Sequence, residues 1–270
     1  MTEYRQKFNE EKQKTSNLEI ELKEMKKVNN LYEKKFADMT IKFEQLNNVT
    51  CKVVKFVKIK NKWKYIPENF KCCENKCIST NKPSGVCING NGFVNLISDE
   101  YIRYYNCVEG KGKDIGAAVH VVNQFKKPQN CFNYSLFYFE IKCKIERELN
   151  NWMVIGLCNT KSFKFNAKNC AIGNEKNEEI KLSTFSWNDN DVFGCGVVYS
   201  PTIVNELPYI FFTQNGKQIG KALLLKDNFD YYELYVILRC CSVETNFGNN
   251  LETKPFIYDI FKYFVCKEFY

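Results

Sequence analysis

The stretch YIFFTQNGKQIGKALL, residues 209–224, decides the fold class of this 270-residue chain. Two runs rich in apolar residues flank Asn215-Gly216, and an Asn-Gly pair between such runs is the strongest short-range signal for a two-residue β-hairpin turn. The stretch therefore predicts two antiparallel strands, over Tyr209–Thr213 and Ile219–Leu224.

Outward from this hairpin, similar short runs recur at the 8–12-residue spacing of an all-β sandwich. N-terminal to all of these runs, apolar residues alternate with lysines from Val57 to Tyr65. This alternation indicates a strand with one solvated face. Further strands are expected over Gly85–Ile88, Gly92–Ile97, Ile102–Asn106, Ala117–Asn123, Leu136–Lys144, Trp152–Cys158, Cys170–Gly173, Val192–Tyr199, Tyr235–Cys240 and Val243–Phe247. The last residues, 256–264, favour a short terminal helix or strand.

The N-terminal arm has a different period. Thr2 to Asn48 contains no Gly or Pro, and apolar residues recur in steps of three and four. A 3.5-residue repeat of this kind is the pattern of a coiled coil. The expected seam comprises Leu18, Leu22, Met25, Asn29, Tyr32, Phe36, Met39, Phe43 and Leu46.

The seam predicts a parallel homodimer through residues 1–48. Asn29 falls at a core a position, where a buried amide fixes register and favours two strands. The flanking pairs Lys14–Glu19 and Glu21–Lys26 would attract each other between parallel chains, whereas Lys7–Lys12 would repel. The alternative is a single amphipathic helix that packs on its own domain or on another protein.

Charge and hydropathy exclude several classes of function. No run approaches the roughly 20 apolar residues that cross a bilayer, so no membrane association is expected. Residues 1–62 hold 15 Lys/Arg against 9 Asp/Glu, whereas the rest of the chain holds 24 against 22. The main domain therefore lacks the clustered basic character of a nucleic-acid-binding face.

The residues that could support catalysis or metal binding are few. His120 is the single histidine, and it lies in an alternating run typical of a strand, so we expect no enzyme and no cofactor. Cysteine–histidine chemistry through His120 would need a thiol beside it. Four of the 14 cysteines, Cys72, Cys73, Cys77 and Cys87, have the spacing C-C-x3-C-x9-C without paired C-x2-C motifs. That spacing disfavours zinc, so we expect no metal site and leave their role open.

The start of the chain, Met1-Thr2-Glu3-Tyr4, lacks the apolar segment of a secretory signal. We therefore expect a cytoplasmic or nuclear protein with reduced cysteines. Secretion would require an upstream start.

Five motifs in order resemble those of SPRY domains. Residues 137–141, FYFEI, resemble the family's "YFEV" strand, and residues 154–157, VIGL, resemble the following "IGL" strand. Residues 190–197, NDVFGCGV, are similar to "GDVIGCGV". Residues 210–220, IFFTQNGKQIG, resemble "FFTKNGxxLG", and residues 246–248 match the closing "NFG". The resemblance implies a bent antiparallel sandwich of two sheets whose loops bind a peptide or protein.

The segment after "NFG", residues 255–260, resembles the Ran-binding-protein-M-like branch, to which expanded SPRY families of plant-parasitic nematodes are also similar. The LisH, CTLH, SOCS-box and RING modules of other SPRY proteins are absent from this sequence. We therefore expect a non-catalytic adaptor that dimerises through its helix. A secreted parasite effector that binds a host protein is the alternative.

These patterns predict a mainly β protein with a coiled-coil helix at residues 1–48. A β extension would follow at 49–135, the SPRY core at 136–250, and a C-terminal segment packing on the sandwich at 251–270. The expected partner-binding residues lie in loops beside the family motifs, with Phe163 and Phe165 exposed among lysines. They are Asn123, Phe125, Lys161, Phe163, Phe165, Arg239, Cys240 and Cys241.

Overall fold

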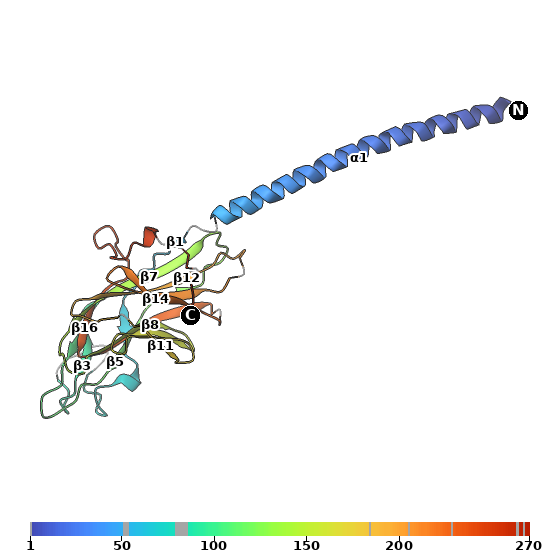
Figure 1. Cartoon of the computed structure of the whole chain (residues 1–270). Helices are drawn as coiled ribbons and strands as arrows, with labels where there is room; N and C mark the ends of the chain where they lie inside the picture. Colours follow the sequence, from blue (N-terminus) through green and yellow to red (C-terminus); the bar gives the residue numbers. More distant parts are fainter. Residues whose placement is uncertain are drawn as a thin grey trace. The chain divides into compact units, whose positions relative to one another are not determined.

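The computed structural model describes residues 2–50, 54–78, 86–183, 185–204, 206–227, 229–262, 265–266 and 268–270. Within the helix, side chains are described at positions 7, 11, 13–15 and 17–42. The chain divides into two compact units, Met1–Cys51 and Lys52–Tyr270 (Figure 1). The predicted combination of a β-sandwich and a long N-terminal helix is confirmed.

The first unit is a single helix, α1 (Thr2–Thr50), of 49 residues. At 1.5 Å per residue it is about 73 Å long. The seam side chains from Leu18 to Met39 that the structure describes are all exposed, including Leu22 at 49% and Phe36 at 70%. Phe43 and Leu46 lie outside the described side chains. None of the described helices has the length and hydropathy required to span a membrane.

The second unit consists of two eight-stranded sheets. The first sheet has the order β14 (Lys217–Leu224), β13 (Tyr209–Gln214), β12 (Val192–Tyr199), β7 (Tyr134–Ile145), β16 (Cys241–Asn246), β4 (Tyr101–Tyr105) and β3 (Phe93–Leu96), with β1 (Val54–Phe56) beside β7. The second has the order β11 (Glu179–Lys181), β10 (Ala171–Gly173), β9 (Ser162–Asn166), β8 (Trp152–Cys158), β15 (Tyr231–Arg239), β5 (Ala117–Val121) and β2 (Trp63–Tyr65), with β6 (Phe125–Lys126) beside β15.

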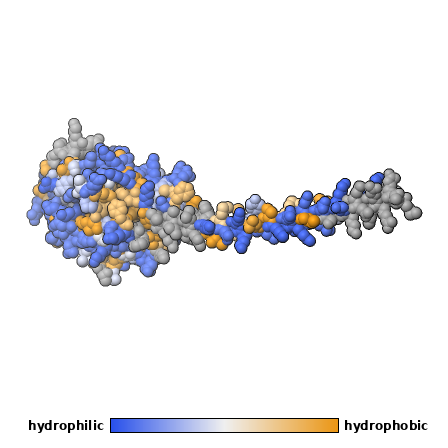
Figure 2. All heavy atoms as spheres, turned by 90° about the horizontal axis from the view of Figure 1, so that it is seen from above, coloured by the Kyte–Doolittle hydropathy of each residue, from blue (hydrophilic) through white to orange (hydrophobic). Residues whose placement is uncertain are grey.

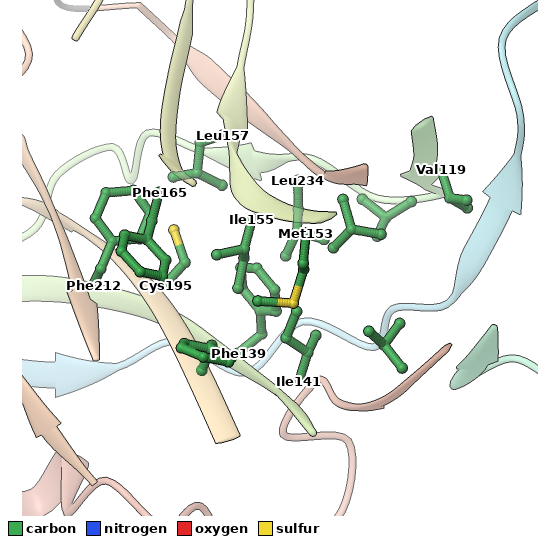
Figure 3. Packing of buried hydrophobic residues seen from close by; sticks show 14 of the residues in the cluster. Val119, Phe139, Ile141, Met153, Ile155, Leu157, Phe165, Cys195, Phe212 and Leu234 are labelled. Carbon is green, nitrogen blue, oxygen red and sulfur yellow. The ribbon is translucent and has the colours of Figure 1, made fainter. Parts of the chain in front are cut away.

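The core lies between the two sheets and follows from strand alternation. Phe139 and Ile141 of β7 point toward Met153 and Ile155 of β8 (Figure 3). All four side chains are fully buried. Because successive side chains of a strand point to opposite faces, each inward row builds one wall of this core.

The outer face of β7 is also buried, which its sequence alternation alone does not predict. The ring of Tyr138 makes an edge contact with Phe256, 5.0 Å between centroids. The carboxylate of Glu140 accepts hydrogen bonds from the backbone amides of Ile257 and Tyr258, at 2.9 and 2.8 Å. The segment after β16 therefore covers the central strand of the first sheet.

Several predicted elements are corrected by the structure. β1 pairs with β7 in parallel, so the first sheet is not purely antiparallel. Residues 86–88 form no strand, and Gly85 lies outside the described residues. Residues 57–62 are irregular, and only Trp63–Tyr65 of that alternating run pairs, as β2. The short 3₁₀ helices η1 (Glu68–Phe70) and η2 (Ile260–Lys262) complete the described secondary structure.

Candidate partner-binding surface

The residues predicted to bind a partner do not form one surface. Lys126 pairs with Tyr231 at the start of β15, and Lys161 forms an ion pair with Asp227 just before that strand. Arg239 is the last residue of β15. Eight steps of about 3.3 Å separate the two ends of β15, roughly 26 Å. Asn123, Phe125 and Lys161 therefore lie at one end of the sandwich, and the Arg239 turn lies at the other.

Phe163 and Phe165 are core residues, so the prediction that they are exposed is wrong. Their exposed fractions are 1% and 0%. They lie on β9, a strand that the prediction treated as a loop, and the ring of Phe165 contacts Phe185 at 5.0 Å and Phe193 at 5.7 Å. The one lysine between them, Lys164, points the other way, because strand neighbours alternate.

Phe125, Cys240 and Cys241 are buried as well, at 5%, 0% and 0%. Phe125 stacks on Phe137, with 5.2 Å between ring centroids. Cys240 forms the turn between β15 and β16 at a φ of 54°, and the thiol of Cys241 donates to the Trp152 carbonyl. These three side chains support the frame and are not available to a partner.

Asn123 is exposed but serves the local structure. Its side-chain amide donates to the Lys60 carbonyl at 2.8 Å, and its backbone amide donates to Asn61 Oδ1 at 3.1 Å. Lys161 is exposed and paired with Asp227. Both residues can be reached by a partner, but their polar groups already have protein partners.

Arg239 has the geometry of a binding anchor. Its guanidinium carbon lies 5.5 Å from the centroid of the Trp152 ring, a cation–π distance. Its Nε–H donates to the carbonyl of Asn150 at 2.9 Å. Trp152 in turn donates its indole N–H to Asn166 Oδ1 at 3.1 Å. Arg239 and Trp152 remain half-buried, so a partner would meet side chains that are already held in place.

An exposed apolar residue directly precedes Asn150, whose carbonyl accepts the Arg239 bond. Leu149, in the loop between β7 and β8, is 76% exposed, and Asn150 next to it is also exposed. We define the Arg239 surface as Leu149, Asn150, Trp152 and Arg239. The sequence prediction included only Arg239, although an apolar residue between charged and polar neighbours in residues 148–150 is a signal that could have identified Leu149.

A partly buried ion pair lies next to the turn that carries Arg239. The guanidinium of Arg147 donates to Asp114 Oδ2 at 3.0 Å, and the other oxygen of Asp114 accepts the backbone amide of Cys107 at 2.8 Å. Burial raises the pKa of Asp114, but the Cys107 amide, the Cys240 thiol and the Arg147 charge together hold that pKa below its ordinary value of 3.8. The backbone amide of Arg147 also donates to the Cys240 carbonyl, which ties this network to the β15–β16 turn.

We expect Asp114→Asn to reduce the free energy of unfolding at pH 7 by about 1.5–3 kcal/mol, the range for a hydrogen bond to a charged group. Because the folded-state pKa is lowered, the ionised carboxylate stabilises the fold above pH 3.8 and loses this effect as the pH falls through the folded-state pKa. Denaturant titrations at several pH values should show the gap between wild type and variant closing under acid conditions.

Asp99→Asn is the matched control, because Asp99 forms an exposed pair with Lys62 at 3.7 Å. Exposed pairs of this kind contribute about 0–1 kcal/mol. A gap for Asp114→Asn that stays constant from neutral to acid pH would contradict the assignment of the stabilising charge to this carboxylate.

The single histidine lies in a stack of aromatic rings. His120 stacks between Tyr65 and Tyr235, at 5.2 and 5.8 Å, and its Nδ1 lies 3.1 Å from Glu233 Oε1. The nearby thiol of Cys158 has its pKa raised to about 12 by burial and by the Glu233 charge. A nucleophilic cysteine needs the opposite shift, so this arrangement does not favour thiol catalysis.

The glycine-rich segment 110–116 is a loop between β4 and β5 and leads into a strand. Phosphate loops require a helix N-terminus at this point. This loop instead carries Asp114, which forms the ion pair with Arg147 described above.

Solved structures of SPRY domains and of lectins are similar to this chain. A crystal structure of a human SPRY domain is 17% identical and matches 58% of this chain and 97% of that chain, with a TM-score of 0.43. The SPRY domain of human HERC1 is 12% identical, with 57% and 92% covered and a TM-score of 0.39. Peanut lectin with a nine-residue peptide is 11% identical, with 57% and 89% covered and a TM-score of 0.33. Similarity at this level does not assign the chain to a family.

No protein-family model matches the sequence, and no curated protein matches it.

Proposed function

We propose that this protein is a non-catalytic SPRY-type adaptor that binds a peptide or protein segment through the Arg239 surface. The five SPRY-like sequence motifs support the family proposal, because they fall on strands β7, β8, β12, β13–β14 and β16 of one two-sheet sandwich. The observation that carries the binding proposal is the guanidinium of Arg239, held over the Trp152 ring and bonded to the Asn150 carbonyl, next in the chain to the exposed Leu149.

The strands form a rigid frame that holds the side chains of Trp152 and Arg239 in place. These side chains would therefore lose little conformational entropy when a partner binds. Strands β8 and β15 pair over seven residues, from Glu233 opposite Cys158 to Arg239 opposite Trp152. Trp and Arg are the residue types that dominate interface energetics, and loops carried by such a scaffold supply specificity. A guanidinium has five N–H donors, and the bond to Asn150 uses one of them. The preferred partner is therefore a segment that offers carboxylate or backbone carbonyl oxygens and an apolar side chain for Leu149.

The test is the pair of substitutions Arg239→Ala and Leu149→Ala, combined in the full chain. We expect the partner recovered with the wild-type protein to bind the double variant at least about tenfold more weakly, as for loss of interface hot spots. Quantitative affinity purification from cell extract would identify the partner, and titration calorimetry would measure the loss.

Lys161→Ala is the matched control, because Lys161 lies at the opposite end of β15 beside Asp227. Binding should be unchanged in this variant. Unchanged binding by the Arg239/Leu149 variant, or an equal loss in Lys161→Ala, would refute the location of the site.

Dimerisation through α1 is the second part of the proposal. Hydrophobic side chains recur along the described part of the helix between hydrophilic ones (Figure 2), and Met25, Tyr32 and Met39 are 63–65% exposed. A second copy of the chain suits this seam because its apolar residues repeat every 3.5 residues and two flanking pairs, Lys14–Glu19 and Glu21–Lys26, attract between parallel chains. Two Arg239 surfaces in one assembly would raise the affinity for a multivalent target.

The compartment that we propose is reducing, the cytoplasm or nucleus. The described cysteines are free thiols, and free cysteines in this number are typical of such compartments. Within SPRY proteins, residues 255–260 favour the Ran-binding-protein-M-like branch, and this segment packs on the outer face of β7.

A further inference from the structure

Four cysteine side chains meet in the loop that precedes β3. Cys72, Cys73 and Cys77 follow η1, and Cys87 comes just before β3. The four sulfur atoms all lie within 4.8 Å of one another. Cys72, Cys73 and Cys87 are buried, and Cys77 is half-buried. The folded chain thus brings together cysteines whose spacing in sequence disfavours a metal site.

The sulfur distances fit a shared metal ion better than disulfide bonds. In a tetrahedral site with Zn–S bonds of 2.3 Å, neighbouring sulfurs lie about 3.8 Å apart. The Cys72 and Cys73 sulfurs are 3.9 Å apart, and those of Cys73 and Cys77 are 3.3 Å apart. A disulfide would need a separation of about 2.05 Å.

Backbone turns hold the thiols in this arrangement. The Cys73 carbonyl accepts the amide of Lys76 at 3.0 Å, and the Cys87 carbonyl accepts the amide of Gly90 at 2.8 Å. Both turns end in a left-handed residue, Lys76 at a φ of 47° and Gly90 at 67°. In addition, the amide of Ile88 donates to Cys77 Sγ at 3.4 Å. Hydrogen bonds of this kind orient ligands and stabilise the negative charge of a metal-bound thiolate.

The surrounding loop has little secondary structure, although Ile66 and Phe70 pack against the main core. The described part of residues 66–92 contains only the three-residue helix η1 and turns. Its buried residues form a small cluster of their own, in which the three buried cysteines pack with Phe93. Long loops without a core are uncommon in compact domains, and a structural metal supplies the missing folding free energy in such segments.

We propose that Cys72, Cys73, Cys77 and Cys87 bind one structural Zn²⁺ ion. Four thiolates are a soft ligand set that suits Zn²⁺ as well as iron–sulfur clusters, and a zinc site closed by four protein ligands has no position for substrate. Binding releases the thiol protons to solvent as each sulfur becomes a ligand.

The proposed zinc loop also contacts the loop that carries Asp114. Asn91 donates its side-chain amide to the Cys72 carbonyl at 2.8 Å and accepts the Lys113 amide on its Oδ1 at 3.0 Å. The Gly90 carbonyl accepts the amide of Val108 at 2.8 Å. The ion would therefore stiffen the loops that lie next to the Arg147–Asp114 pair (teal and green segments near β3 and β5 in Figure 1).

The test starts from the metal content of the full chain purified under reducing conditions. Elemental analysis should find about one zinc per chain. The zinc content of the double variant Cys77→Ser/Cys87→Ser should be at least tenfold lower than that of the wild type. The control Cys131→Ser/Cys170→Ser should retain it, because these two thiols contact Ser135 and Ala167, outside the proposed site.

Two further measurements keep the proposal testable if the cluster variant fails to fold. Replacement of zinc by Co²⁺ in the wild-type protein should produce the intense visible bands of tetrahedral tetrathiolate cobalt. When the protein is purified and denatured without reductant, in the presence of a chelator, all 14 thiols should react with a thiol reagent. A count four lower, with the matching mass loss, would show two disulfides and overturn the proposal. Bound iron, or wild-type protein that takes up neither zinc nor cobalt, would also overturn it.

Discussion

Phe165→Ala is expected to lower the free energy of unfolding by about 3–5 kcal/mol, the range for truncation of a buried phenylalanine. Phe165 is fully buried, and its ring on β9 contacts Phe193 of β12 and Phe212 of β13, at 5.7 and 6.0 Å. The substitution therefore leaves a cavity between the two sheets. For a unit of this size, each kcal/mol of lost stability lowers Tm by about 2–4 °C. We therefore expect the Tm of the variant to be roughly 10 °C below that of the wild type.

Phe132→Ala is the control for this prediction, since Phe132 is 69% exposed and exposed truncations usually change stability by less than about 0.5 kcal/mol. Denaturant titration of both variants measures the difference directly. A Phe165→Ala protein as stable as Phe132→Ala, but impaired in partner binding, would restore the original prediction that this ring belongs to a recognition loop.

The sequence predicted the hairpin and most strands because each signal there is local. The Asn215-Gly216 turn and the alternation within β7, β8 and β12 need only neighbouring residues to be recognised. The same information was present for β9, where Phe163, Lys164 and Phe165 alternate apolar and polar as a half-buried strand does. Treating that segment as a loop was an error of interpretation, and it produced the wrong exposure of both rings.

The candidate surfaces could not be predicted in the same way, because they join residues distant in sequence. Arg239 meets Trp152 only because β15 pairs with β8 in one particular register. The cysteine cluster depends on two turns with left-handed residues, Lys76 and Gly90, and positive φ at a lysine has no reliable signal in sequence. The division of the predicted binding residues between opposite ends of the sandwich likewise follows from sheet order, which strand prediction does not provide.

The helix provides the other large expected effect. We expect Leu22→Glu/Met39→Glu to convert a dimer of the full chain into a monomer. In a parallel pair each chain would bury both side chains, and burial of an apolar side chain of this size contributes about 1.5–3 kcal/mol. Loss of four such side chains per dimer, with like charges brought together at the seam, should weaken association at least about a thousandfold.

The helix offers a matched control in Ile20→Glu/Ile41→Glu. Ile20 and Ile41 are apolar and 55% and 52% exposed, yet both fall at f positions, which face away from the a/d seam of a coiled coil. Both double variants add the same charge at similar places along α1, so they differ only in the face that they change. Light scattering and sedimentation over a range of concentrations should show twice the chain mass for wild type and for the Ile20/Ile41 variant, and a single chain mass for the Leu22/Met39 variant. A wild-type protein that stays monomeric at high micromolar concentration would contradict dimerisation and favour a single amphipathic helix that packs on its own domain or on another protein.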